Sequence, residues 1–176
     1  LRHSYAGFTP KAEVLADVAR VEQLWESCAA FDESGGGWLF GHYSLADVFY
    51  APVATRIATY NLPVGPRAQT YVAKSLALPA FRRWRAMGLA EGFVQPGYDL
   101  DLPSSPWPGP TPLAARAVDS GAALNAHCPY SGKTVAANAL LEIDGQVIGF
   151  CNPFCRDKTL HDPEAWPDAM ALLTGR

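Results

Sequence analysis

The residues best suited to chemistry in this sequence are three cysteines in its last third. Cys128 is separated by 22 residues from Cys151, and three residues separate Cys151 from Cys155. With four cysteines among 176 residues, the chain has too few for a disulfide scaffold, so the clustering favours metal or redox chemistry in a reducing compartment. Thiolates suit soft or borderline ions, and zinc prefers four ligands. The spacing therefore predicts a zinc site built on Cys128, Cys151 and Cys155.

A fourth zinc ligand would come from a histidine or from outside the protein. His161 follows Cys155 by six positions, at the end of a short helix expected over residues 153–160, and it is the ligand that we favour. His127 adjoins Cys128, and adjacent residues seldom bind one ion together. A water molecule or an exogenous group is the remaining alternative.

A β-hairpin is expected to bring the thiols together. Asp144-Gly145 separates the apolar runs 140–143 and 146–150, and this dipeptide favours a tight turn in which both residues have positive φ. Cys151 comes directly after the second run. The hairpin would fold Cys128 back towards Cys151 and Cys155, so that the sulfur atoms converge.

The segment resembles the TRASH/YHS-type treble-clef modules of metal trafficking and sensing proteins. The resemblance rests on the Cys-Pro turn at 128–129, the hairpin that ends in Phe-Cys, the C-x3-C pair and the letters DPEAW at 162–166. It implies a small α+β hairpin–helix module over residues 124–176 with a structural metal site. Ser131 stands where such modules often carry another cysteine. Two alternatives stay open: a site that senses or transfers metal, and reduced thiols that hold no metal.

The N-terminal part has the pattern of helices. Apolar residues recur at steps of four and three between residues 10 and 32, which predicts one buried face of a long helix. This face consists of Val14, Val18, Val21, Trp25 and Cys28. Cys28 lies on that face, where a packed, inert thiol is expected. Ser44 and Asp47 then have the spacing of a capping box, and they predict a helix that continues to about Tyr60.

These residues resemble the C-terminal domain of bacterial glutathione S-transferases. The letters WLFG at 38–41, YSLAD at 43–47 and LPA at 78–80 carry the resemblance, which covers roughly residues 10–95. It implies a mainly α fold in which the capping box begins the core helix of a helical bundle. In that family this domain lines the pocket for the electrophilic substrate. By position, we expect Tyr50, Arg56 and Tyr60 to be candidates for such a pocket.

The resemblance also implies that a further domain or another chain packs against this one. Family members bind glutathione with an N-terminal thioredoxin-like domain, and no segment here offers its βαβ pattern; the sequence also begins with Leu1 rather than Met. Exposing the apolar stripe of the first helix would cost about 1.5–3 kcal/mol for each large side chain. We therefore expect a missing thioredoxin-like domain or another chain to cover the stripe, and a homodimer. No catalytic residue is assigned here, and the chain alone is expected to be inactive.

Composition bounds the remaining possibilities. A net charge of −3 and a pI near 5.8 give no basic field for nucleic acid. There is no uncharged apolar run of the ~18 residues that a membrane span needs, nor an apolar N-terminal signal, so we expect a cytoplasmic protein. Five prolines at 103–112 predict a connector over 103–123 between a helical domain (1–102) and the cysteine module (124–176).

Two functions follow from these expectations. The first is the C-terminal part of a glutathione S-transferase-like protein that supplies the electrophile site and dimer surface, with an appended zinc-binding tail. The alternative is a non-catalytic metal-binding or protein-interaction module. The sequence carries no G-x-S-x-G, H-E-x-x-H or Gly-rich phosphate loop with a lysine, so a hydrolase has little support.

Overall fold

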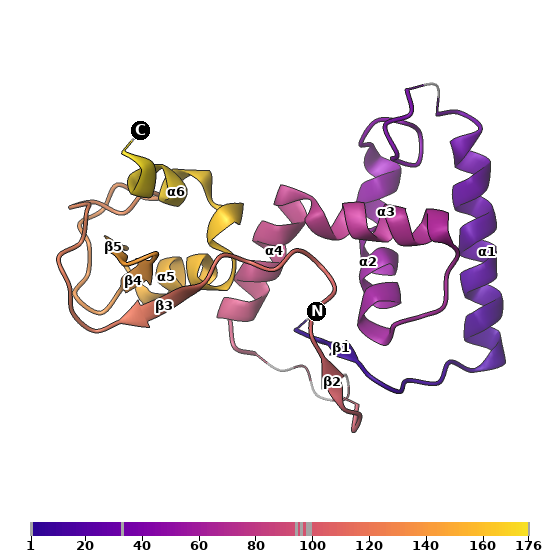
Figure 1. Ribbon diagram of the computed structural model, residues 1–176, viewed down its shortest axis with the longest axis horizontal. Coiled ribbons are helices and arrows are strands. Elements are labelled where there is room, and N and C mark those ends of the chain that lie inside the picture. Colours follow the sequence, from indigo (N-terminus) through magenta and orange to yellow (C-terminus); the bar gives the residue numbers. More distant parts are fainter. Residues whose placement is uncertain (1, 33, 94, 96, 98–99, 176) are drawn as a thin grey trace. The chain divides into compact units, whose positions relative to one another are not determined.

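The computed structural model describes all residues except 1, 33, 94, 96, 98–99 and 176. The chain forms two compact units (Figure 1). The N-terminal unit comprises Leu1–Leu78 and Pro96–Pro110, and the C-terminal unit comprises Pro79–Gln95 and Thr111–Arg176. The predicted fold class, a mainly helical region and a small hairpin–helix module, is confirmed.

In the described part of the N-terminal unit, the chain forms three helices and a short two-stranded sheet. The helices are α1 (Ala12–Ala29), α2 (Leu45–Tyr60) and α3 (Pro66–Ala77). The antiparallel strands β1 (Ser4–Tyr5) and β2 (Ser104–Ser105) pair across about a hundred residues, so the proline-rich segment returns to this unit. α2 ends where Asn61 adopts a left-handed conformation with φ 48°, and α3 begins with Pro66, which suits the first position of a helix.

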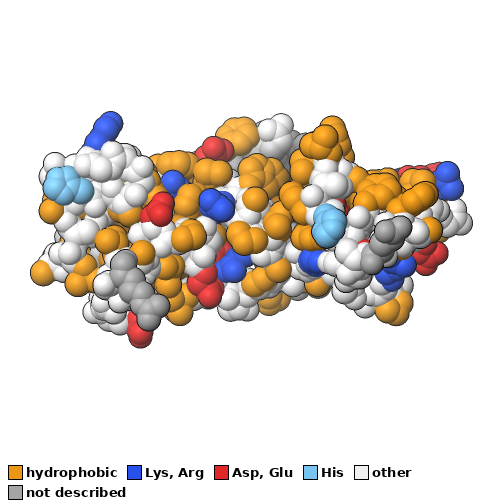
Figure 2. Space-filling view, turned by 90° about the horizontal axis from the view of Figure 1, so that it is seen from above, with side chains coloured by type: hydrophobic (Ala, Val, Ile, Leu, Met, Phe, Trp, Pro, Cys, Tyr) orange, Lys and Arg blue, Asp and Glu red, His pale blue; other side chains and the backbone are white. Residues whose placement is uncertain are grey.

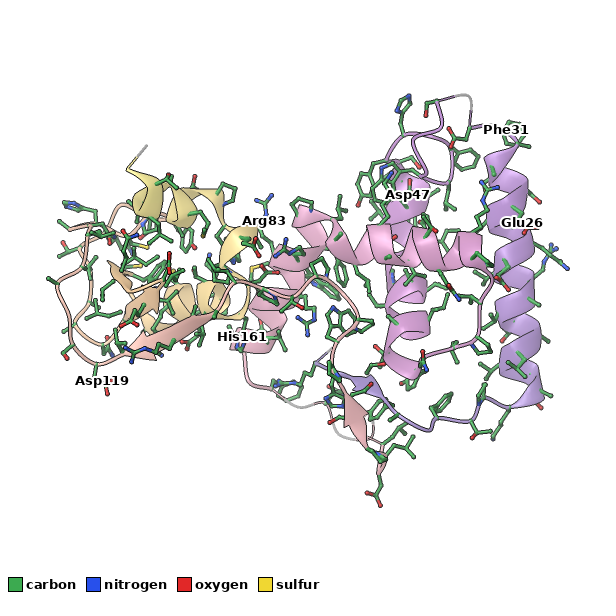
Figure 3. All side chains as sticks on the ribbon, in the orientation of Figure 1. Glu26, Phe31, Asp47, Arg83, Asp119 and His161 are labelled. Atoms are coloured by element: carbon green, nitrogen blue, oxygen red, sulfur yellow. The ribbon has the colours of Figure 1, made fainter. Side chains whose placement is uncertain are left out.

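A buried carboxylate fixes the start of α2, as the capping-box pattern predicts. Asp47 is 2% exposed, and its Oδ2 accepts hydrogen bonds from the Ser44 N–H at 2.8 Å and the Ser44 hydroxyl at 2.9 Å. Its Oδ1 accepts from the Leu39 N–H and from the Tyr71 hydroxyl of α3, each at 3.1 Å. Asp47 thus joins the loop before α2, the helix itself and α3 (Figure 3).

The core of the N-terminal unit forms around aromatic side chains. Trp25 of α1 packs edge-on against Tyr50 of α2 and lies 4.5 Å from Tyr71 of α3, measured between ring centroids. The predicted buried face of α1 is confirmed, because the two buried residues of the helix, Val18 and Trp25, both lie on it. Val14, Val21 and Cys28, the other members of this face, are only partly buried. Leu15 and Leu24, which lie on the same helix outside this face, are exposed.

The C-terminal unit contains a three-stranded antiparallel sheet in the order β3-β4-β5. Its strands are β3 (Ala115–Val118), β4 (Leu140–Ile143) and β5 (Gln146–Gly149). The Asp144-Gly145 turn joins β4 to β5 with φ 49° and 74°, which confirms the predicted hairpin. The helices α4 (Pro79–Ala90), α5 (Pro153–His161) and α6 (Pro167–Thr174) and the 3-10 turn η1 (Pro163–Ala165) complete the unit.

One hydrophobic core holds the C-terminal unit together. Its fully buried members include Leu141, Ile143, Ile148 and Phe150 from the hairpin, all at 0% exposure, together with Ala86 of α4. Ala86 shows that α4 packs with the cysteine-containing segment. The charged contacts of α4 agree, because Arg82 donates to the buried carboxylate of Asp162 at 2.8 and 2.6 Å.

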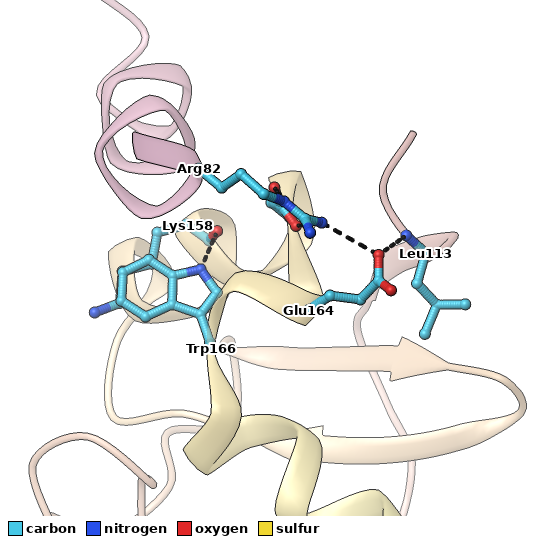
Figure 4. A network of polar contacts seen from close by, with 6 residues as sticks. Arg82, Leu113, Lys158, Glu164 and Trp166 are labelled. Atoms are coloured by element: carbon cyan, nitrogen blue, oxygen red, sulfur yellow. Dashed lines mark hydrogen bonds and ion pairs between the residues drawn. The ribbon is translucent and has the colours of Figure 1, made fainter. Parts of the chain in front are cut away.

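Glu164 extends that contact (Figure 4). Its carboxylate accepts from Arg82 at 3.2 Å and from the backbone N–H of Leu113 at 3.3 Å. Nearby, the indole N–H of Trp166 donates to the carbonyl of Lys158 at 3.0 Å. These bonds tie α4, α5 and the turn η1 to one another and to the segment that leads into β3.

The compact units do not follow the predicted ranges 1–102, 103–123 and 124–176. Residues 79–90 pack with the cysteine-containing segment because the small Ala86 side chain and the Arg82 guanidinium meet their partners there. The proline-rich range 103–123 contains the strands β2 and β3, one in each unit. Strand pairing thus anchors both ends of this range.

On the face shown in Figure 2, hydrophobic side chains cover much of the surface. Acidic and basic side chains stand between them as scattered groups rather than as a field of one sign. No helix among the described residues combines the length and the apolar character needed to span a bilayer.

Candidate metal centre

The structure brings the three predicted thiols together in the C-terminal unit. The sulfur atoms of Cys128, Cys151 and Cys155 all lie within 4.8 Å of one another. Those of Cys151 and Cys155 are 4.0 Å apart. Cys128 is 2% exposed, whereas the other two side chains are half-buried. The cluster is therefore closed on the side of Cys128 and more open on the other.

Three local structural features position the sulfur atoms. The turn after Cys128 closes through bonds from the Cys128 N–H to the Lys133 carbonyl at 2.8 Å and from the Gly132 N–H to the Cys128 carbonyl at 2.9 Å. Cys151 follows Phe150, whose buried ring anchors the end of β5. The side chain of Asn152 caps α5 by accepting from the Cys155 N–H at 2.9 Å, which places Cys155 in the first turn of that helix.

The surroundings of Cys128 favour a thiolate. Burial by itself raises the pKa of this thiol, but the backbone N–H groups of Tyr130, Cys151 and Ser131 and the Ser131 hydroxyl all bond to its sulfur and bring the pKa down to about 7. An N–H group stabilises a thiolate far more than a thiol, because the charged acceptor makes the stronger hydrogen bond. The backbone thus supplies the anionic form that metal ions bind.

The neighbouring sulfur shows the opposite behaviour. Burial, the charge of Cys128 and the hydrogen bond with Cys151 raise the pKa of Cys155 to about 11. Like charges at this separation disfavour each other, so a cation is needed for the thiols to ionise together. Three converging sulfur donors with N–H support match the ligand type that zinc and soft ions accept. The residues present therefore fit a thiophilic metal ion.

Two polar side chains flank the open side of the cluster. The Ser131 hydroxyl donates to the Cys151 sulfur at 3.2 Å, in addition to its bond with Cys128. The Asn152 amide donates to the same Cys151 sulfur, also at 3.2 Å. Both residues are exposed. The sequence marks Ser131 only as a departure from a four-cysteine pattern, and it gave no sign of this contact or of that made by Asn152.

Neither histidine considered as a fourth ligand joins the cluster. Among the residues that the structure describes, the convergent group consists of the three cysteines alone. His161 lies at the C-terminal end of α5 (Figure 3), and six residues of helix carry it about 9 Å along the axis from Cys155. His127 is exposed and pairs with Thr134 as a β-bridge on the turn that holds Cys128.

The candidate pocket residues Tyr50, Arg56 and Tyr60 are spread along α2 and do not converge. Tyr50 contacts Trp25, and the ring of Tyr60 stacks on Tyr5. Arg56 is exposed. Their role towards a substrate stays a prediction, and the two tyrosines have packing roles in the N-terminal unit.

A hollow of about 260 Å³ between α1, α3 and the loop before α2 was not foreseen from the sequence. Trp25, Trp38 and Tyr71 form its aromatic walls, and Glu22 lies at its edge with its carboxylate bonded to the Gly65 N–H at 2.6 Å. The indole N–H of Trp25 is buried and has no hydrogen-bond partner among the described residues. Its lining comes from three separate segments, so no local pattern could reveal it.

Comparison with known proteins identifies one part of the chain. Residues 11–86 match the family model of the glutathione S-transferase C-terminal domain. Searches of curated proteins and of solved structures found no match. The matched segment reaches from the start of α1 into α4 and is similar to that domain, as its capping box and helical pattern predict. The matched range ends before the three cysteines, so the resemblance of residues 124–176 to TRASH/YHS-type modules stays a prediction.

Proposed function

We propose that this protein binds a zinc ion through Cys128, Cys151 and Cys155, in a small module joined to a glutathione S-transferase C-terminal domain. The single observation that carries the proposal is the convergence of these sulfur atoms within 4.8 Å of one another, with backbone N–H groups directed at the most buried of them. Negatively charged thiolates would bind the zinc cation, and this binding involves no change of oxidation state.

The role proposed for the ion is structural. The three sulfurs come from a turn, from the residue after β5 and from the first turn of α5, so one ion would join three segments that are separate in sequence. A module of this size has a small core and gains stability from such a cross-link. Because the ligands converge only in the folded chain, binding free energy adds to folding free energy.

Metal analysis of the purified chain tests this proposal. We expect about one zinc per chain, lost in Cys151→Ser, because three thiolates are the main source of affinity. Cys28→Ser is the matched control, since its thiol lies on α1 in the N-terminal unit and should leave zinc content unchanged. A chain that holds no zinc after refolding with the metal, yet keeps an ordered C-terminal unit, would refute a structural site.

Two alternatives give different results in the same experiment. A sensing or transfer site would release its ion to a competing chelator within minutes without unfolding, whereas a structural site would exchange slowly and only as the unit opens. Reduced thiols without metal would react with a thiol reagent in the native chain at a rate that added zinc does not change.

We further propose that the helical unit contributes to the electrophile pocket and dimer surface of a glutathione-conjugating protein, whose thioredoxin-like domain would activate the glutathione thiol. The family match over residues 11–86 and the partly covered stripe on α1 support this. The test is conjugation of glutathione to an activated aryl halide. The chain alone should give the uncatalysed rate, and the chain expressed with its upstream coding sequence should exceed it. A rate equal to the background in both samples favours the alternative, a non-catalytic platform for the metal module.

A further inference from the structure

The geometry points to a fourth ligand position at Ser131 that a small exogenous thiol can occupy. This inference rests on the proposed metal site and deepens it. Ser131 and Asn152 form the side of the cluster that faces solvent. The fourth ligand of the ion comes from outside the chain.

The first observation is the asymmetry of burial around the sulfur atoms. Cys128 is buried at 2% exposure, whereas Cys151 and Cys155 are half-buried. Ser131 and Asn152, which both donate to the Cys151 sulfur, and Phe154, which directly precedes Cys155, are all exposed. A small molecule can therefore approach the cluster from this side without displacing the hydrophobic core.

The second observation is the chemistry of the groups on that side. Among the described residues, no histidine, carboxylate or further cysteine joins the three thiols. The polar groups nearest Cys151 are a hydroxyl and a carboxamide, each 3.2 Å from its sulfur. Zinc in proteins takes thiolate, imidazole and carboxylate ligands, so a neutral hydroxyl competes weakly with an incoming thiolate.

The third observation is a cation close to the exposed sulfurs. Lys158 lies about one helical turn after Cys155 in α5. The ammonium group is held 4.0 Å from the centre of the Tyr130 ring and 4.1 Å from that of Trp166. A cation fixed beside the cluster reduces the repulsion that another thiolate would meet.

The exchange itself is a simple substitution. The incoming thiol loses its proton to solvent, and its sulfur takes the position that faces Ser131. The Ser131 hydroxyl or a water molecule leaves unchanged. No electrons are transferred, so no oxidant or reductant is needed.

Cobalt(II) loaded into the full chain provides the test, because each thiolate ligand adds to its near-ultraviolet charge-transfer absorption. Titration with 2-mercaptoethanol should raise this band by a factor of about 1.3, the ratio of four thiolates to three, and saturate at one thiol per ion. Ethylene glycol, which carries a hydroxyl in place of the thiol, should cause no change. Native mass spectrometry should show the added mass of one 2-mercaptoethanol.

Two variants make the assignment specific to Ser131. Ser131→Cys should show the stronger band from the start and no response to thiol, because its own sulfur fills the position. Ser131→Ala should respond like the unmodified chain, which shows that the fold tolerates loss of the hydroxyl. A cobalt-loaded chain that ignores the thiol, or loses its cobalt to it, overturns this inference and leaves the metal site standing. If the cobalt-loaded chain shows no sulfur–cobalt band before thiol is added, the result contradicts the proposed metal site itself.

Discussion

The guanidinium of Arg82 binds the carboxylate of Asp162 through two hydrogen bonds of 2.8 and 2.6 Å, across 80 positions of sequence. Arg82 lies in the part of the chain that matches the glutathione S-transferase domain, and Asp162 follows the helix that carries Cys155. Most of α4 thus lies in the segment that is similar to this family, while the helix packs within the cysteine-containing unit.

Arg82→Ala should destabilise the C-terminal unit by about 3 kcal/mol, because the carboxylate of Asp162 is buried and would lose its charged partner. Urea unfolding followed by near-ultraviolet circular dichroism measures the change. Arg83→Ala is the control, since this neighbour is exposed (Figure 3) and should shift stability by about 0.5 kcal/mol or less. Equal effects of the two substitutions would show that the ion pair does not stabilise the unit.

Asp47→Ala should cost the N-terminal unit about 3 kcal/mol or more. The change leaves the N–H groups of Ser44 and Leu39 and the Tyr71 hydroxyl without their acceptor in a buried place. Ser44→Ala should cost about 1 kcal/mol, the usual value for an N-cap residue. Thermal unfolding monitored at 222 nm gives both numbers. Asp17→Ala, at an exposed position of α1, serves as the control. The reverse order of costs for Asp47 and Ser44 would contradict the central place of the carboxylate.

Tyr71 should make stability fall in alkali. Burial, followed by the charge of Asp47 and the hydrogen bond to it, raises the pKa of the Tyr71 hydroxyl above its ordinary value of 10.0. Above about pH 10 the unfolded chain therefore releases this proton while the folded chain keeps it, so the free energy of unfolding decreases as pH rises. Stability curves between pH 8 and 11 should lose part of this slope in Tyr71→Phe. An identical slope in the variant would argue against the effect.

Removal of metal should loosen the C-terminal unit and leave the N-terminal unit unchanged. In the zinc-loaded chain the amide N–H of Phe150, bonded to the Ala139 carbonyl at 2.9 Å, should exchange slowly with deuterium. A chelator should accelerate its exchange by about 100-fold, since metal binding stabilises the folded form by mass action. Amides of α2 supply the internal reference. Exchange that rises equally in both units, or in neither, would contradict a structural ion confined to the cysteine cluster.

Several features of this protein depend on residues close in sequence, and the sequence alone predicts them. The apolar stripe of α1, the Ser44–Asp47 capping box and the Asp144-Gly145 turn each involve neighbours within about four positions, where backbone geometry and side-chain type decide the outcome. The convergence of Cys128, Cys151 and Cys155 was also within reach, because a two-residue turn folds the intervening chain back on itself.

Other features follow from tertiary packing, and no local pattern carries them. The contact of Ser131 with Cys151 spans 20 positions, the pairing of β1 with β2 spans about a hundred, and the packing of α4 depends on partners near residue 162. His161 illustrates the same limit, because its six-residue spacing from Cys155 suggests proximity while the rise of α5 carries it away. Local sequence determines which element forms and where it turns. Which elements then lie against one another is decided by the burial of apolar surface and buried charge over the whole unit, to which residues far apart in sequence contribute together.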